Sequence, residues 1–231
     1  LFLDDDDEVG ENLIKLHVDN LLYFNADVSS GIAVVPGEEI PEKFNHIRVS
    51  DVFPTNNTLI KKDVFRKTGL FDLAYEHGPR ADGDMGIRVY LSGALMILNN
   101  EISLLHHHSR HGGLRMHKAR IVSSSKARKS IFRRHLISPT EIYLIKRYFN
   151  EEQLKEAVLR NILNTFRMER NVILKILKAI VAFIYLPNTI FSVLNNVKKA
   201  EELFKNYPII DKYDYKKYNK MDIELIINRK K

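Results

Sequence analysis

Cysteine is absent from this sequence of 231 residues, and its absence sets the first limits on the chemistry of the protein. It excludes a disulfide framework and a thiolate nucleophile, and it suits a reducing compartment. No low-complexity tract, internal repeat or signal-peptide pattern is visible. With 45% hydrophobic and 28% charged residues, the chain can bury one α/β core with a helical extension, so we expect one or two folded units.

The sequence also lacks an uninterrupted run of about 20 apolar residues, the length that a membrane-spanning helix needs. Residues 172–186 are the most apolar stretch, and Pro187 interrupts it. Lys175 and Lys178 beside an apolar face fit two interpretations. The helix could lie on a membrane surface, or it could pack on the rest of the protein.

Charge is unevenly distributed along a chain whose net charge is +7. Acidic residues crowd positions 4–11, whereas Arg, Lys and His crowd positions 110–134. A basic segment of this kind can bind a phosphate-bearing ligand, nucleic acid or an anionic membrane surface. It can equally be a solvated helix face.

The apolar pattern predicts mixed helices and strands in the first half and helices in the second. Residues 1–3 resemble the end of a buried strand, and since the chain opens at Leu1 rather than at methionine, we expect an earlier part of the fold to precede it. Gly69 and Gly93 are placed to end helices, and Asn150 with Gln153 resembles a capping box. We predict helices at 11–23, 61–68, 84–92 and from 119 onward, strands at 32–35, 94–98 and 102–105, and a loop at 38–50.

Four consecutive aspartates after a strand repel one another unless a positive charge lies among them. Mg²⁺ and Mn²⁺ prefer carboxylate and phosphate oxygens. Because alternate residues of an extended segment point the same way, Asp4 and Asp6 are candidates to share one ion while Asp5 faces elsewhere. The alternative is a solvated acidic loop, or acids that cap the helix near Glu11.

A second acidic point, Asp82-Gly83-Asp84, precedes a predicted helix. Asp84 suits the N-cap of that helix. Asp82, one step outside the helix, could point into a cleft and accept a proton from an attacking hydroxyl.

The run His106-His107-His108 ends a predicted strand and suggests a metal ligand. A structural zinc site needs four ligands, and no cysteine is present to supply any. One imidazole that completes a carboxylate-held ion is a more economical interpretation. Histidines on the surface are the alternative.

A basic loop around Gly112-Gly113 contains Arg110 and Arg115. Arginines in a glycine-containing loop can fold over a diphosphate and donate charge-assisted hydrogen bonds to it. A solvated loop remains the other interpretation.

The order of these motifs resembles that of glycosyltransferase family 2. The similarity covers about residues 1–120, and each motif alone is common. The segments that carry it are Phe2-Leu3-Asp4-Asp5-Asp6-Asp7, which resembles the DxD element; residues 54–60 followed by Gly69-Leu70-Phe71-Asp72, which look like the acceptor-side segment; Ala81-Asp82-Gly83-Asp84-Met85 with Arg88 and Gly93; and His106.

We expect residues 121–231 to form a helical extension that could associate with a membrane. The resemblance implies a GT-A fold that lacks its first strands. It also implies a nucleotide-sugar donor, a Mn²⁺ or Mg²⁺ cofactor, a carbohydrate or lipid-linked acceptor and inversion at the anomeric carbon. Asp4 and Asp6 would then hold the metal with His106, and Asp82 would be the base. Ala81 stands where the family pattern has Glu, so one supporting carboxylate is missing.

Two other classes of function stay open. Residues 5–9 also resemble the nucleophile motif of haloacid dehalogenase-type phosphatases, although convincing Ser/Thr and Lys elements do not follow. A non-catalytic basic module could instead dock on nucleic acid or anionic lipid. For the glycosyltransferase we expect no nucleic-acid partner, a role in polysaccharide or cell-envelope synthesis, and a cytoplasmic location with peripheral contact to the inner face of the cell membrane.

Overall fold

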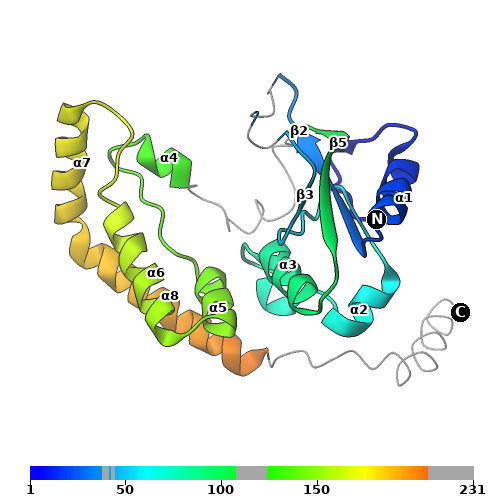
Figure 1. Cartoon of the computed structure of the whole chain (residues 1–231). Helices are drawn as coiled ribbons and strands as arrows, with labels where there is room; N and C mark the ends of the chain where they lie inside the picture. The colour runs from blue at the N-terminus through cyan, green and yellow to red at the C-terminus, as the bar shows by residue number, and fades with distance from the viewer. Residues whose placement is uncertain (38–41, 43–44, 108–123, 208–231) are drawn as a thin grey trace, which may run out of the picture. The chain divides into compact units, whose positions relative to one another are not determined.

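The computed structural model describes residues 1–37, 42, 45–107 and 124–207, and its chain divides into two compact units (Figure 1). A sheet unit contains residues 1–71 and 82–107 among those described. A helical unit contains Asp72–Ala81 and residues 124–207. The boundary expected near residue 120 lies outside the described residues.

The sheet is mixed, which confirms the α/β class for the first half of the chain. Its order is β1-β5-β2-β4, and β3 also pairs with β5. The pair β2–β5 is parallel, while β1–β5, β3–β5 and β2–β4 are antiparallel. The strands are β1 (Asp7–Glu8), β2 (Val28–Val34), β3 (Arg48–Val49), β4 (Thr58–Ile60) and β5 (Met96–His106).

Three helices complete the sheet unit: α1 (Leu13–Tyr23), α2 (Lys62–Thr68) and α3 (Ala81–Leu91). Gly69 and Gly93 follow α2 and α3 with φ values of 72° and 76°, which confirms their predicted role as helix stops. A hydrophobic cluster that includes Met85 and Val89 of α3 joins this helix to the starts of β2 and β5.

Several predicted strand bounds are wrong. The strand predicted at 32–35 is β2, which begins at Val28, and the predicted loop 38–50 contains β3 at Arg48–Val49. Residues 1–3 are not a buried strand: only Phe2 forms an isolated bridge, to Thr58, while Leu1 and Leu3 are both 42% exposed. The predicted strands 94–98 and 102–105 are one strand, β5. Asn99 does not break it, because its side chain accepts a hydrogen bond from the Glu101 backbone and donates one to Asn20.

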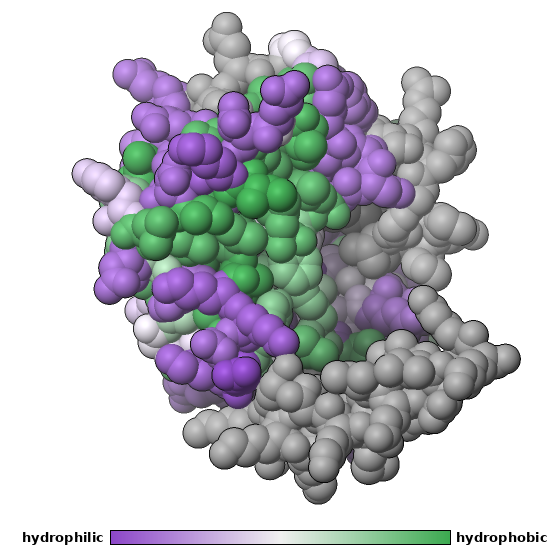
Figure 2. Space-filling model, turned by 90° about the vertical axis from the view of Figure 1, so that its right-hand side faces the viewer, coloured by the Kyte–Doolittle hydropathy of each residue, from purple (hydrophilic) through white to green (hydrophobic). Residues whose placement is uncertain are grey.

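Helix α1 turns an apolar row outward. Leu13 and His17 are buried on the side of α1 that packs on the sheet. Ile14, Leu22 and Tyr23 are exposed, Leu22 by 74%. Figure 2 views the molecule from the side on which α1 lies in Figure 1 and shows hydrophobic surface gathered between hydrophilic patches.

The helical unit begins with a short 3₁₀ turn and contains five α-helices in its described residues. Asn150 and Gln153 form the predicted capping box, and Ser138 with Glu141 forms another. Tyr143 donates a hydrogen bond to Asp72. The elements are the 3₁₀ turn Leu73–Tyr75, α4 (Ser124–Arg128), α5 (Pro139–Tyr148), α6 (Glu151–Asn164), α7 (Val172–Ile184) and α8 (Leu186–Asn206).

Helices α7 and α8 meet at a bend of 63° beside Tyr185, with Pro187 in the first turn of α8 as the sequence suggested. Within the described residues, neither helix alone has the length and apolar character to cross a membrane, although the bent pair together meets that requirement. Lys178 does not border an exposed apolar face. It is buried, and its ammonium donates hydrogen bonds to the carbonyls of Ser130 and Arg133, at 2.8 and 2.6 Å.

Candidate metal and catalytic site

The four aspartates form a tight turn before β1 rather than an extended strand end. The backbone N–H of Asp7 lies 3.3 Å from the carbonyl of Asp4, and the N–H of Asp4 donates to Asp7 Oδ2 at 2.7 Å. Two hydrogen bonds between residues three apart therefore close this loop. Asp7 then enters β1 and pairs with His106, the last residue of β5.

His106 is held against this turn. Its Nδ1 lies 2.9 Å from Asp7 Oδ1 and 3.5 Å from Asp6 Oδ1. The Asp7 side chain is only 1% exposed, and that of His106 is 12% exposed. If Nδ1 carries the proton and donates it to Asp7, Nε2 is the nitrogen with the lone pair, which is how a carboxylate orients a metal-binding imidazole.

One side-chain atom from each of Asp4, Asp7 and His106 lies within 4.8 Å of the other two, so these three residues could hold a metal ion. Asp4 and His106 were predicted as ligands, and Asp6 lies next to the group through His106. Asp7 was missed. Alternation along an extended segment pairs Asp4 with Asp6, whereas the turn brings together residues three apart.

The pKa of the Asp4 carboxyl is raised above its ordinary value. Partial desolvation of the carboxyl is the main cause, and the negative charges of Asp7, Asp6 and Asp5 act in the same direction, while His106 opposes them. A bound cation would reverse this effect, because it stabilises the ionised carboxylates. The donor set, carboxylates with one imidazole, suits Mn²⁺ or Mg²⁺.

Asp82 lies in the first turn of α3, not outside the helix as predicted. The helix begins three residues earlier than expected, at Ala81, directly after Arg80 with a φ of 90°. The Asp82 side chain is half-buried and accepts a hydrogen bond from the Gly83 backbone at 2.9 Å. Among the described residues, Asp82 makes no hydrogen bond or ion pair with Asp4, Asp7 or His106.

Asp84 is not the N-cap. It is fully buried in α3, where its Oδ2 accepts a hydrogen bond from Arg88 Nε at 2.9 Å and lies 2.7 Å from Arg88 Nη2 in the same ion pair. Arg88 Nη1 also donates to the carbonyls of Thr68 and Leu70, both at 2.7 Å. This pair therefore ties α3 to the end of α2.

The acidic turn and the start of α3 are anchored in the same hydrophobic cluster. Phe2, two residues before Asp4, packs in it by its edge-to-face contacts with Phe53 and Phe71, and Met85, three residues after Asp82, is fully buried in it.

No protein-family model and no curated protein matches this chain, so the class of the protein rests on these residues and on the order of the motifs.

The predicted diphosphate-binding residues Arg110 and Arg115 lie outside the described residues, as do His108, His111 and His117. Their proposed contacts with a nucleotide sugar stay predictions.

A buried polar network supports the sheet behind the site. Asn57, in the segment that resembles the acceptor side of the family, donates through Nδ2 to the carbonyls of Ile32 and Ile102, so its Oδ1 must accept from His17 Nε2, at 2.8 Å. His17 Nδ1, 2.8 Å from Ser29 Oγ, is then the acceptor. These bonds are all satisfied by a neutral imidazole, and burial lowers the pKa of His17.

We expect the protein to lose stability as the pH falls below about 6.5, the ordinary pKa of histidine. In that range the unfolded state binds a proton at His17 and the folded state does not, so the free energy of unfolding rises with pH until the unfolded histidine is neutral. Urea unfolding at several pH values between about 5 and 8 gives the free energy of unfolding, which should rise less steeply with pH for His17→Gln than for the wild type. The same change at exposed His77 is the control. If the free energy of unfolding of the His17 variant depended on pH as steeply as that of the wild type, His17 would not be the neutral buried histidine inferred here.

Proposed function

We propose that this chain contains the C-terminal part of a GT-A domain similar to glycosyltransferase family 2. It would transfer a sugar, with inversion, from a nucleotide-sugar donor to a hydroxyl of a carbohydrate or lipid-linked acceptor. The observation that carries the proposal is the meeting of Asp4 and Asp7 with His106, which follows Asp7 by 99 residues in sequence, at the end of a mixed sheet.

One group of site residues would bind the metal, and another residue would act on the acceptor. Asp4, Asp7 and His106, with Asp6 beside them, would hold Mn²⁺ or Mg²⁺. When bound, such an ion neutralises charge on the diphosphate of the leaving nucleotide. Arg110 and Arg115 would add positive charge to the same diphosphate.

Asp82 would be the general base of this reaction. Its carboxylate is half-buried and lies in the first turn of α3. It would take the proton from the acceptor hydroxyl as the oxygen attacks the anomeric carbon. Synthesis of this kind uses nucleotide sugars of the cytoplasm, so we propose a cytoplasmic active site that serves polysaccharide or cell-envelope assembly.

A direct test measures Mn²⁺ binding and turnover. We expect the protein to bind Mn²⁺, which is measured as a loss of the electron paramagnetic resonance signal of the free ion. We also expect it to release a nucleoside diphosphate from one member of a nucleotide-sugar panel. Asp4→Asn and His106→Gln should weaken Mn²⁺ binding by about tenfold or more, because each removes one candidate ligand.

Two neighbouring residues provide matched controls. Asp5→Asn removes the same charge from the same turn, and His107→Gln makes the same change at an exposed histidine that pairs with Glu8. Both should retain Mn²⁺ binding within about twofold. Equal losses in the control variants would show only general attraction of cations to the acidic turn. Phosphate release from a phosphomonoester, with no donor cleaved, would favour the phosphatase instead.

A further inference from the structure

Helix α7 presents one continuous apolar face that nothing in the described residues covers. Six of its aliphatic and aromatic side chains are between 43% and 70% exposed. They recur at spacings of three, four and seven residues, which places them on one side of the helix. These residues, which we call the α7 face, are Ile173, Ile176, Leu177, Ile180, Phe183 and Ile184.

The exposure of the α7 face follows from how the helix is anchored. Lys178, on the opposite side, is buried and bonds two carbonyls of the loop before α5, so α7 cannot rotate to hide its apolar side. Ala182, one turn further along, is buried on that same anchored side. The following helix continues the exposed surface with Phe191 and Leu194.

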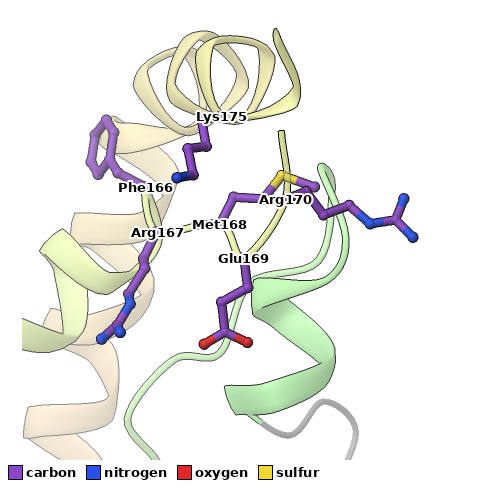
Figure 3. Close-up of a pocket in the computed structure, with 6 residues that line it drawn as sticks. All are labelled: Phe166, Arg167, Met168, Glu169, Arg170 and Lys175. Carbon is purple, nitrogen blue, oxygen red and sulfur yellow. The ribbon is translucent and has the colours of Figure 1, made fainter. Parts of the chain in front are cut away.

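The charges near this surface are mainly positive. Residues 171–200 contain four lysines and no acidic residue. At the N-terminal end of α7, an open hollow of about 690 Å³ is lined by Phe166, Arg167, Met168, Glu169, Arg170 and Lys175 (Figure 3).

In Figure 3, Lys175 reaches from α7 toward the loop below it, and the guanidinium groups of Arg167 and Arg170 point outward on either side. Glu169, the one acid of the hollow, pairs with Arg128. Within the part of the chain that the structure describes, Arg167, Arg170 and Lys175 form no ion pair. An apolar face bordered by such cations complements a surface that is both apolar and negatively charged.

We propose that the α7 face docks the helical unit on an anionic phospholipid bilayer, with α7 lying in the interface plane. Insertion across the bilayer is disfavoured, because α8 is committed to the core of its unit through Val193 and Ala200, which pack with Tyr143 and Leu154. A helix of 13 residues is also only about 20 Å long, against about 30 Å of hydrocarbon. This proposal does not depend on the glycosyltransferase assignment.

Vesicle flotation tests the docking. The intact protein should bind vesicles of phosphatidylcholine mixed with phosphatidylglycerol, and the double variant Ile180→Asp/Phe183→Asp should bind them about tenfold less or weaker still. Leu22→Asp/Tyr23→Asp, which makes an equally polar change on the exposed side of α1, should bind like the wild type. Because all four positions are exposed, the thermal unfolding midpoint should stay the same in both variants, which separates docking from folding.

The charged rim is tested separately. Arg170→Gln and Lys175→Gln should each lower binding to phosphatidylglycerol vesicles by about fivefold, and leave binding to pure phosphatidylcholine unchanged. Raising the salt concentration should have the same effect as these variants. If the double variant Arg170→Gln/Lys175→Gln bound phosphatidylglycerol vesicles with wild-type affinity, the proposed preference for anionic lipid would be wrong.

Three further results would overturn the proposal. One is wild-type protein that does not float with the anionic vesicles. Another is a dimer in light scattering that the Ile180→Asp/Phe183→Asp change dissociates, with no vesicle binding, because the α7 face would then bind a second copy. The third is resistance of the bound protein to alkaline carbonate, which would indicate that the bent α7–α8 pair is inserted into the bilayer.

Discussion

Replacement of Asp82 by asparagine is expected to lower the rate of sugar transfer by about 100-fold or more, because an amide cannot accept the acceptor proton and a positioned base contributes about 10²–10⁴-fold. The fold should be retained. The carboxylate accepts one hydrogen bond, from the Gly83 backbone, and an amide oxygen can accept it equally well. The measurement is kcat with the donor that the nucleotide-sugar panel identifies.

The control for this variant is Asp63→Asn, which changes another acid in the first turn of a helix, α2. It should retain wild-type turnover. Because asparagine followed by glycine is prone to deamidate to aspartate and isoaspartate, Asp82→Ala should be measured in parallel. If kcat of both Asp82 variants stays near normal while Mn²⁺ binding and donor cleavage persist, Asp82 is not the base, and the metal site stands without it.

Removal of the Asp84 carboxylate should destabilise the protein by about 3–5 kcal/mol, the cost of leaving a buried charge without its partner. Its side chain has no exposed surface, and that of Arg88 is only 10% exposed. Asp84→Ala would leave the guanidinium bonded to the carbonyls of Thr68 and Leu70 alone. Urea unfolding should show this as a lower midpoint with an unchanged slope.

Asp63 and Arg66 are the matched exposed pair, at 2.8 Å and with both side chains largely in solvent. Asp63→Ala should cost less than about 1 kcal/mol, because solvent screens the pair. In the double variant Asp84→Ala/Arg88→Met, most of the loss should be recovered, since no unpaired charge remains buried. A loss for Asp84→Ala as small as that for Asp63→Ala would show that the pair does not tie α3 to α2.

The elements that were predicted well depend on short-range chemistry. Gly69 and Gly93 end their helices because they adopt positive φ, and Asn150 starts α6 through hydrogen bonds within four residues. The break before α8 follows from Pro187 in the same way. These signals act within a few residues, and in these three places no distant contact overrides them.

The errors share another cause. Asp84 looks like an N-cap in sequence, but Arg88 and the end of α2 draw it into the interior. Lys178 fitted either a helix on a membrane surface or one packed on the protein, and its hydrogen bonds to two carbonyls, of residues 130 and 133, hold it in the interior. In both cases backbone carbonyls distant in sequence help to make burial of a charge tolerable: those of Thr68 and Leu70 hold Arg88, the partner of Asp84, and those of residues 130 and 133 hold Lys178.

From its residues alone, this chain could be read as an α/β protein without thiol chemistry, with acids at one end, a histidine after a strand, and an apolar helix near the other end. The tertiary structure decided which of these residues meet. Pairing of β1 with β5 places Asp7 against His106, and the turn selects Asp4 as their companion. That choice depends on strand register, which joins residues 99 positions apart, and on the geometry of a turn that joins residues three apart.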